Sequence, residues 1–493
     1  MTTGDGSVVG AAGRAFSWNL VAIGVAQSVG FGVFLVLADK LSPAAFGVFA
    51  IAALAVDVVA AQGRQAVTDH LVQARDSQGR PVAEVFTAAL VLALLAWAGL
   101  ALLAAPLARA IDAPDLALVL PLLGVTMPLA AVQAVLEAGV LQRLAFRDYA
   151  ARTMGGALAG AGAALVCVVS PFAPAALAVQ RIAAALAMIA LLYPKAGPTR
   201  PALAAPSAQL RSRAPTIMRL WGAHIVNGLL ARVTDVIVGA RLGLEALGVL
   251  RVADRVIDAA HAVVTAPLNV AWAPILSALR DDSAGRARQY LELTSLAALL
   301  CAPAFVGLAL VSAELGRLLF DDRYAAAASL LPLAALAGLA APFAHFRAAV
   351  LTALGRTRAV LMLTIADFVV TAAAVWIGAG AGLVGAATGA LVASVAGAGA
   401  SLFIVARAIG VSPMAGVSAA APAFVAAAAM AAPAWVLHAV APTLTDLVRL
   451  TLVAAGGAAT YAAVLVLVFP RWTRARVAFV RPPAPAPGEP ARA

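Results

Sequence analysis

Five ionisable residues recur on one side of an otherwise apolar stretch at residues 246–272. Arg251, Asp254, Arg255, Asp258 and His261 stand at i, i+3, i+4, i+7 and i+10, and at 3.6 residues per turn these positions share one face of a helix. The opposite positions are mostly valine and alanine. The spacing predicts a helix with a charged face, defined by these five residues, and an apolar one.

The preceding apolar stretch, 219–240, adds His224, Asn227, Arg232 and Asp235, which fall largely on one side. An ionisable side chain at the centre of a bilayer costs about 2.5–3.5 kcal/mol on insertion scales, so it needs a partner or water. One interpretation is a pair of helices lining a wet cavity, where arginine and the neutral polar groups bind substrate. Asp235, Asp254 and Asp258 would then orient the arginines or take a cation. The alternative is ion pairs at i, i+3 and i, i+4 that neutralise one another at a helix interface.

Isolated charges occur in other apolar stretches. Asp57 and Asp367 are lone carboxylates, and each could cap a neighbouring helix or serve as a proton or cation site. Glu137, Arg181 and Arg347 lie near the ends of apolar stretches, where long side chains can snorkel toward water.

The sequence lacks the common catalytic and cofactor motifs. Metal-ligand spacing, a Ser/His/Asp arrangement, a phosphate loop and a glycine-rich dinucleotide fingerprint are absent. We therefore expect no catalytic residues, no metal and no cofactor, and a protein that is not an enzyme. Without a site for ATP hydrolysis, transport would need an ion gradient or a partner.

The composition shows what surrounds these residues. Of 493 residues, 63% are hydrophobic and 12% are charged, and the mean hydropathy is +0.97. Soluble domains have roughly 45–50% apolar and about 25% charged residues. A soluble enzyme, a disordered chain, a fibrous protein and a disulfide scaffold are excluded, and the chain is predicted to be an all-α integral membrane protein.

Stretches of about 20 apolar residues predict about fourteen transmembrane helices. The predicted spans are 15–37, 44–62, 83–106, 115–138, 153–171, 173–193, 219–240, 246–272, 288–312, 327–350, 358–378, 383–406, 417–438 and 447–469. They define an N-terminal six-helix bundle (1–193), a proline-rich linker (194–218), a second six-helix bundle (219–408), two additional helices (409–470) and a disordered tail (471–493).

The basic residues predict the orientation. With the N-terminus inside, about 23 Lys and Arg residues fall in inner segments, Arg64 and Arg152 among them, and about six fall outside. The outer residues are Lys40, Arg109, Arg241, Arg317, Arg323 and Arg449. Both termini, the linker and the tail are therefore predicted to be cytoplasmic. The net charge of +11 is spread over these loops without a basic block carrying aromatics, so we expect no nucleic-acid partner.

An internal repeat supports two bundles. Leu41, Ala45, Gly47 and Val48 recur as Leu242, Ala246, Gly248 and Val249, an offset of about 201 residues that relates the first span to the seventh. The segments 120–122 and 331–333 give a second match, between the fourth and tenth spans. Parallel repeats of this kind pack as two bundles around a midplane site, an organisation typical of transporters.

Four segments resemble the corresponding stretches of bacterial polysaccharide exporters, the Wzx-type flippases of the multidrug/oligosaccharidyl-lipid/polysaccharide exporter superfamily. They are 41–50 (LSPAAFGVFA), 235–243 (DVIVGARLG), 246–255 (ALGVLRVADR) and 318–324 (LLFDDRY). The resemblance covers most of residues 10–410. It implies two six-helix bundles with two trailing helices, an inner-membrane location and alternating access.

The resemblance also implies a function. The substrate would be an oligosaccharide linked to undecaprenyl pyrophosphate, moved from the cytoplasmic to the periplasmic leaflet. Arg255 matches the basic position that ends the family's motif in this span, which implies that it faces the anionic substrate. Leu250 stands where the family has an aromatic residue, and this leaves the sugar undefined.

Partners would be the lipid-linked oligosaccharide, membrane lipid, H⁺ or Na⁺, and a polysaccharide polymerase and glycosyltransferases. Two alternatives share the fold, a peptidoglycan-precursor flippase and a cation-coupled drug antiporter. A membrane glycosyltransferase or polymerase is disfavoured because the outer loops are all short.

Overall fold

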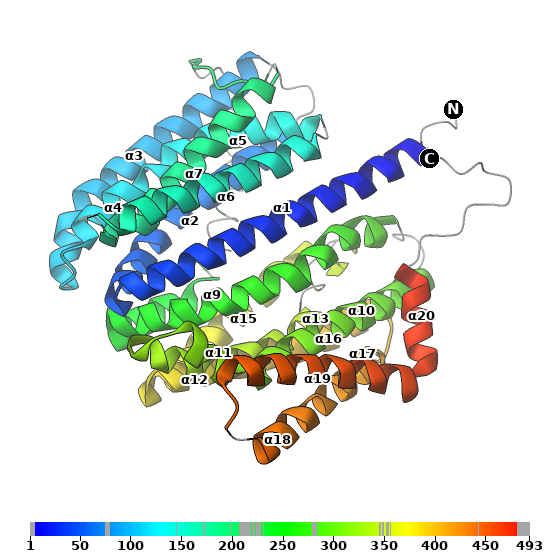
Figure 1. The fold of residues 1–493 in the computed structure, drawn as a ribbon. Helices are drawn as coiled ribbons and strands as arrows, with labels where there is room; N and C mark the ends of the chain where they lie inside the picture. The colour runs from blue at the N-terminus through cyan, green and yellow to red at the C-terminus, as the bar shows by residue number, and fades with distance from the viewer. Residues whose placement is uncertain are drawn as a thin grey trace. The chain divides into compact units, whose positions relative to one another are not determined.

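A computed structural model gives the arrangement of the helices (Figure 1). Long apolar stretches form helices because lipid offers the backbone no hydrogen-bond partner, so each segment must satisfy its own peptide groups. The described part of the chain contains helices and no strands. It comprises residues 5–73, 79–143, 145–170, 173–197, 199–205, 207, 218, 222, 228–229, 231–278, 283–344, 347, 350–351, 354, 356–441 and 443–480.

Eleven helical stretches of this described part are long and apolar enough to cross a membrane, and one of them, Arg358–Ile409, contains two helices. These stretches match the predicted spans except 219–240 and 246–272. Much of 219–230 lies outside the described residues, and 246–272 belongs to α9 (Val233–Ala278). The all-α membrane fold is confirmed, with the number of spans near fourteen.

Contacts within the described chain group it into two compact units. Unit 1 comprises Met1–Pro267, Leu319–Leu331 and Met362–Ala393, and unit 2 comprises Leu268–Leu318, Pro332–Leu361 and Ser394–Ala493.

The N-terminal part of unit 1 is a helical bundle. Its helices are α1 (Asp5–Lys40), α2 (Pro43–Gln73), α3 (Arg80–Ala110), α4 (Leu116–Gly124), α5 (Thr126–Gln142), α6 (Phe146–Val168) and α7 (Ala176–Leu192), with 3₁₀ turns at Ala173–Ala175 and Tyr193–Lys195. The helix α4 continues into α5 across a break at Val125, and together they form the fourth span. The 3₁₀ turn Ala173–Ala175 leads directly into α7, which lies side by side with α6.

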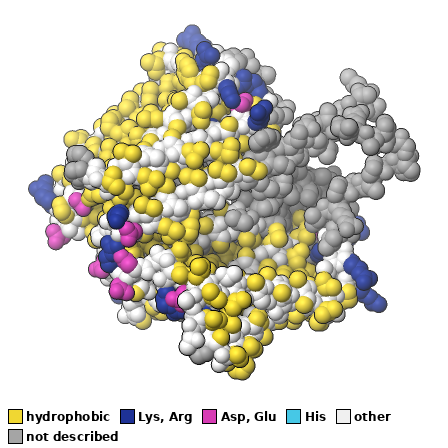
Figure 2. All heavy atoms as spheres, in the orientation of Figure 1, with side chains coloured by type: hydrophobic (Ala, Val, Ile, Leu, Met, Phe, Trp, Pro, Cys, Tyr) yellow, Lys and Arg dark blue, Asp and Glu magenta, His cyan; other side chains and the backbone are white. Residues whose placement is uncertain are grey.

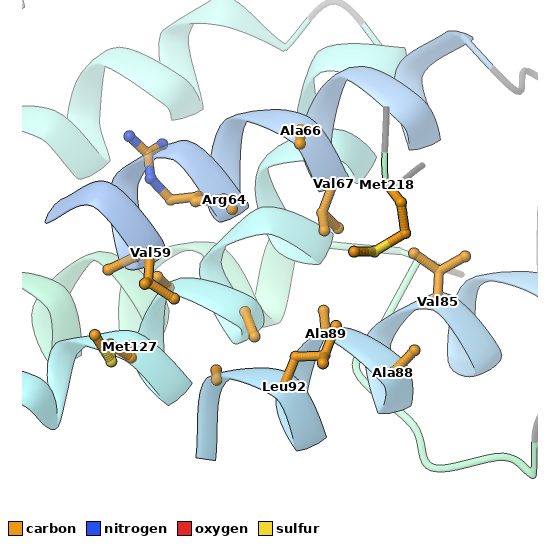
Figure 3. A pocket seen from close by; sticks show the side chains of 15 residues that line it. Val59, Arg64, Ala66, Val67, Val85, Ala88, Ala89, Leu92, Met127 and Met218 are labelled. Carbon is orange, nitrogen blue, oxygen red and sulfur yellow. The ribbon is translucent and has the colours of Figure 1, made fainter. Parts of the chain in front are cut away.

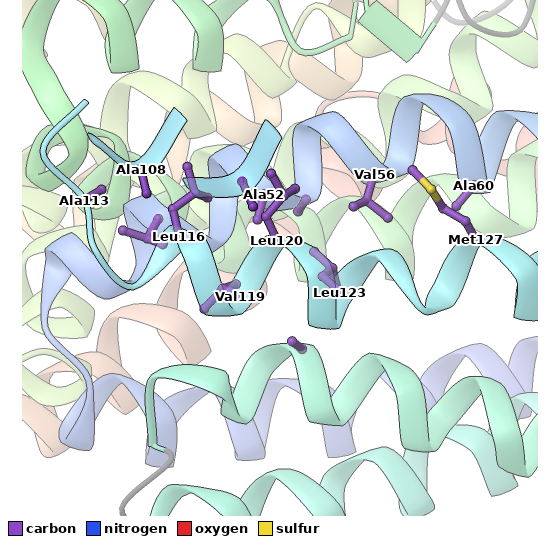
Figure 4. Packing of buried hydrophobic residues seen from close by; sticks show 14 of the residues in the cluster. Ala52, Val56, Ala60, Ala108, Ala113, Leu116, Val119, Leu120, Leu123 and Met127 are labelled. Atoms are coloured by element: carbon purple, nitrogen blue, oxygen red, sulfur yellow. The ribbon is translucent and has the colours of Figure 1, made fainter. Parts of the chain in front are cut away.

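Small and branched residues close the interior of this bundle. Figure 4 shows Ala52, Val56 and Ala60 of α2 facing Leu123 and Met127 of α4 and α5. Leu123 and Val56 are completely buried. The outer surfaces are apolar as well: Figure 2 shows hydrophobic atoms over the middle of α6 and α7 and charged atoms near the helix ends. Leu102 and Val166 are more than 70% exposed, which is expected where lipid replaces water.

Unit 1 also contains the C-terminal segments that contact α1 and α2. These are α9 up to Pro267, the 3₁₀ turn Asp322–Tyr324 with the start of α12 (Ala325–Gly338), and the hairpin of α15 (Thr357–Gly378) and α16 (Gly382–Ile409). Gly382, at φ +83°, allows the reversal between α15 and α16. A Cβ at Gly389 would overlap the carbonyl of Ala374, so the hairpin is tightly packed.

Unit 2 is a second group of helices. It contains α10 (Ser283–Leu310), α11 (Ser312–Leu319), α13 (Ala341–Ala344), α17 (Pro413–Ala429), α18 (Ala431–Val440), α19 (Asp446–Leu467) and α20 (Pro470–Val480), with the C-terminal part of α16. The Tyr461 hydroxyl donates to the Leu299 carbonyl over 2.9 Å and joins α19 to α10. Arg476 of α20 donates to Ser295 of α10 over 2.9 Å. Residues 471–480, which the sequence assigned to the disordered tail, form α20, and the tail beyond Val480 is outside the described residues.

Candidate functional site

The break between the seventh and eighth spans is a single glycine. Gly243 has φ +88° and ψ 179°, a conformation that residues with a Cβ rarely adopt, and it divides α9 into a short helix and a long one. The sequence predicted the separation here, between 240 and 246. The long helix that follows carries the charged face.

The two copies of the repeat pack against each other at this point. A Cβ at Gly47 would overlap the Leu244 carbonyl, and a Cβ at Gly248 would overlap the Pro43 carbonyl. These contacts are reciprocal, because Pro43 and Leu244 are separated by the same 201 residues as Gly47 and Gly248. The repeat therefore specifies a close contact between the start of α2 and the start of the long part of α9, which we name the glycine seam.

The turn between α1 and α2 is also held by a third segment. The Tyr324 hydroxyl donates to the Leu41 carbonyl over 2.8 Å, and Arg323 donates to the Asp39 carbonyl over 2.7 Å. Phe46 packs edge-on against the ring of Tyr324, with centroids 6.1 Å apart. Three of the four segments that resemble polysaccharide exporters, 41–50, 246–255 and 318–324, thus meet at one end of the α1 and α2 helices.

The charged face of α9 is held by ion pairs. Asp235 is buried, and it accepts a hydrogen bond from Arg251 and lies 3.5 Å from Arg232. Arg251 also lies 3.5 Å from Asp254, the i, i+3 pair that the sequence allowed as an alternative. On the opposite face, Val249, Val252 and Val256 are buried.

Asp57 extends this network to the N-terminal bundle. Its carboxylate accepts a 2.6 Å hydrogen bond from Arg181 of α7 and lies 3.7 Å from Arg232. Arg181 also stacks 5.2 Å from the ring of Phe49. Arg181 therefore has an anionic partner, Asp57, inside the bundle.

A cavity of about 420 Å³ lies in front of these residues, and we name it the arginine cavity. Besides apolar and glycine residues of α1, α2 and α7, its lining includes Gln180, Arg181, Arg232, Arg251, Arg255 and Asp258. Arg255 lies against α1 where Gly30 leaves room, since a Cβ there would be 2.7 Å from its Nη2 atom. The charged face therefore borders a cavity and is internally ion-paired.

The other predicted residues are placed differently. Asp254 is half-buried beside Arg251, and His261 lies further along α9. Asp367 lies on α15 and lines neither of the cavities described for unit 1. His224 and Asn227 lie outside the described residues.

A second ionic network, between α2, α5 and α6, was not predicted. Glu137 is 2% exposed, and it accepts hydrogen bonds of 3.0 and 2.7 Å from Arg64 Nη1 and of 2.5 Å from Arg152 Nη1. The guanidinium of Arg152 also lies 4.0 Å from the centre of the Tyr149 ring. The sequence placed Arg64 and Arg152 in inner loops and Glu137 at a snorkelling position. All three lie inside helices, because each charge has a partner there.

One signal could have identified this network. A carboxylate in an apolar span requires a partner, and Arg64 and Arg152 are the basic residues at the same predicted end of neighbouring spans. The network borders a cavity of about 570 Å³, which we name the glutamate cavity. Its polar and charged lining residues are Asp57, Arg64, Thr126, Gln133, Glu137, Tyr149, Arg152, Thr153 and Arg181.

An apolar pocket lies on the other side of α2. Its lining includes Arg64, Ala66 and Val67, and Figure 3 shows the guanidinium of Arg64 directed away from Leu92 and Met218. The same arginine thus covers apolar surface with its methylene groups and places its charge at Glu137.

The chain is similar to proteins that make or move polysaccharides. Residues 36–329 match the family described as polysaccharide biosynthesis protein. The succinoglycan biosynthesis transport protein ExoT of Rhizobium meliloti (strain 1021) is 26% identical over 334 residues, which are 68% of this chain and 67% of that protein.

Solved structures show the same fold at low identity. The lipid II flippase MurJ, in an inward closed conformation, aligns with a TM-score of 0.73 and 12% identity over 93% of this chain and 99% of that one. An inward-facing multidrug resistance MATE family transporter of the MOP superfamily aligns with a TM-score of 0.60 and 16% identity over 78% and 94%. The chain belongs to the polysaccharide biosynthesis protein family, as a multi-pass membrane protein with the fold of the MOP-superfamily flippases and transporters.

Proposed function

We propose that this protein is a flippase that moves an oligosaccharide linked to undecaprenyl pyrophosphate across the bacterial inner membrane, from the cytoplasmic to the periplasmic leaflet. The observation that carries the proposal is the arginine cavity. In a chain of this family it brings Arg232, Arg251 and Arg255 to one polar space inside apolar helices.

The chemistry of such a substrate matches these residues. A pyrophosphate-sugar head group must cross about 30 Å of hydrocarbon, and its charge must be compensated on the way. A guanidinium offers several fixed donors that can hold a phosphate in a bidentate manner. We assign head-group binding to Arg255, Arg251 and Arg232, together with His224 and Asn227. Arg255 has the central role, because it lines the arginine cavity and, among the described residues, forms no ion pair within 4.0 Å.

The aspartates provide a means of coupling. Arg251 is bound to Asp235 and Asp254, and Arg232 lies near Asp57 and Asp235. A phosphate that takes over an arginine leaves a carboxylate without its cation. Because an isolated buried carboxylate is costly, it would take a proton or Na⁺. Asp57, Asp235, Asp254 and Asp258 are therefore our candidates for orienting the arginines and for ion coupling, with Asp367 as a separate candidate on α15.

The glycine seam is the contact that alternating access would have to open. It lies at the end of the helices that carries Lys40 and Arg241, which the distribution of basic residues predicts to be periplasmic. With both termini in the cytoplasm, separation of the α2 and α9 starts would expose the arginine cavity to the periplasm.

The experiment is the replacement of Arg255 by alanine in a strain whose polysaccharide export depends on this protein. We expect export to be lost while the variant inserts into the membrane at the normal level. Arg317→Ala is the matched control, since Arg317 is half-exposed on α11, pairs with Asp446 in unit 2 and lines neither cavity. Polymer at the wild-type level from Arg255→Ala would refute the assignment.

Two other transport activities are compatible with the fold. A peptidoglycan-precursor flippase would complement a strain depleted of that activity, and a cation-coupled antiporter would confer drug resistance. Glycosyltransferases and a polymerase are the partners we propose for polysaccharide export. A labelled-sugar transfer assay with purified protein tests the remaining possibility of an enzyme, for which we expect no turnover.

A further inference from the structure

The hydrogen-bond donors of the network formed by Arg64, Glu137 and Arg152 are only partly used. Arg64 and Arg152 each bind Glu137 through Nη1, and among the described residues the Nε of Arg152 is buried without a hydrogen-bond partner. Arg152 is 5% exposed. Buried arginine donors normally find acceptors, so this site has capacity for more negative charge than one carboxylate supplies.

The neutral polar residues of the same cavity offer hydrogen-bond acceptors. Thr126 and Thr153 donate their hydroxyl hydrogens to the carbonyls of Leu123 and Tyr149. Gln133 donates its amide hydrogen to the Ala185 carbonyl over 3.2 Å. With these donors occupied, the oxygens remain as acceptors. Oxygen acceptors beside two arginines are complementary to a molecule that carries hydroxyl donors and an oxyanion.

The cavity is large enough for such a molecule and adjoins the arginine cavity. Its volume of about 570 Å³ exceeds that of the arginine cavity, and Arg181 and Ala184 line both. An extended head group could therefore place its pyrophosphate in one cavity and its sugars in the other.

We propose that the glutamate cavity is a second oxyanion site, for a carboxylate or phosphate borne on a sugar, and that Glu137 occupies the position of this anion until the sugar displaces it. This rests on the proposed function for the origin of the sugar. The binding itself is a property of Arg64, Glu137 and Arg152 that free sugar acids can test.

The experiment measures binding to the purified full-length chain in detergent by isothermal titration. The probes are glucuronate, a sugar carboxylate; glucose 1-phosphate, a sugar phosphate; and glucose as the neutral reference. In Glu137→Gln the arginines lose their resident carboxylate while a side chain of the same shape remains. We expect at least one anionic probe to bind about tenfold more tightly than to the wild type, and glucose to show no gain.

Two further variants make the result specific. Adding Arg64→Gln to Glu137→Gln should abolish the gain, and Arg64 is 29% exposed, so its loss is tolerable for folding. Glu314→Gln is the matched control: Glu314 is 1% exposed near Arg317 and His438 in unit 2, and its replacement should leave binding unchanged. If Glu137→Gln unfolds, Arg64→Gln alone must weaken the binding of glucuronate or glucose 1-phosphate relative to the wild type.

The two probes also identify the anion. A gain for glucuronate indicates an acidic sugar, and a gain for glucose 1-phosphate indicates a sugar phosphate. A gain for neither, or an equal gain in Glu314→Gln, would overturn the proposal. These outcomes are independent of export, so a loss of export in Arg255→Ala with unchanged binding in Glu137→Gln would contradict this inference and leave the proposed function in place.

Discussion

The two ionic networks of unit 1 differ in how far their members are separated in the sequence and in how exposed they are. The α9 network includes the local pairs Arg232–Asp235 and Arg251–Asp254, and the Asp254 side chain is 31% exposed. In the other network Glu137 is 73 residues from Arg64, 15 from Arg152, and 2% exposed. The spacing of charges along one helix thus indicates the α9 network, which borders the arginine cavity. Arg64, Glu137 and Arg152 form the other network, which we name the shielded network; they lie on three different helices, so the spacing along one helix does not indicate it.

The largest effect is expected from a substitution that breaks the shielded network. Glu137→Ala leaves the buried Arg152 without its anion, and removing one partner of a buried pair costs about 3–5 kcal/mol. We expect this loss in the free energy of unfolding, measured by denaturant titration in detergent. A loss below about 1 kcal/mol would mean that water already compensates Arg152, and the two networks would then be equally wet.

A smaller effect is expected at the glycine seam, where α2 meets the helix that carries the α9 network. Gly248→Ala places a methyl group against the Pro43 carbonyl, and overpacking of this kind costs about 1–3 kcal/mol. Export should fall with stability, because the start of α9 is displaced.

The control for this prediction is another helical glycine. A Cβ at Gly24 of α1 meets no atom within 4 Å, so Gly24→Ala should be neutral or stabilising by about 0.4–1 kcal/mol. Equal destabilisation by both substitutions would show that helix flexibility, and not the close contact, explains the glycine in the repeat.

The smallest effect is expected for Asp254→Asn. Its 3.5 Å pair with Arg251 is partly exposed, and such pairs contribute about 0–1 kcal/mol. Stability measured by thermal unfolding should be almost unchanged, whereas transport should lose its dependence on the coupling ion if Asp254 is the coupling site. A stability loss as large as that of Glu137→Ala would remove the distinction between the networks.

Sequence periodicity predicted the helices well, because lipid requires uninterrupted apolar segments with internal hydrogen bonds. It shortened α2, however, by treating Arg64 as a loop residue, while α2 continues to Gln73. Within this extension Arg64 pairs with Glu137, which lies on a different helix.

The charged face of α9 could be predicted because the spacing of its residues is local. The spacing of Arg251, Asp254, Arg255 and Asp258 placed them on one helical face, and three of them line the arginine cavity. The partner of Asp57 could not be predicted, because Arg181 is 124 residues away and only the packing of α2 against the rest of the bundle joins them. Likewise, the repeat indicated two related segments, but only the structure shows that they contact each other.

The most direct measurement is translocation of the lipid-linked oligosaccharide in proteoliposomes, followed by the accessibility of its sugars to a reagent outside the vesicle. We predict that the wild type and Arg317→Ala expose the sugars at the same rate, while Arg255→Ala, reconstituted in equal amount, exposes them no faster than protein-free vesicles. Translocation by Arg255→Ala at the rate of the wild type would contradict a role for the arginine cavity in carrying the anionic head group.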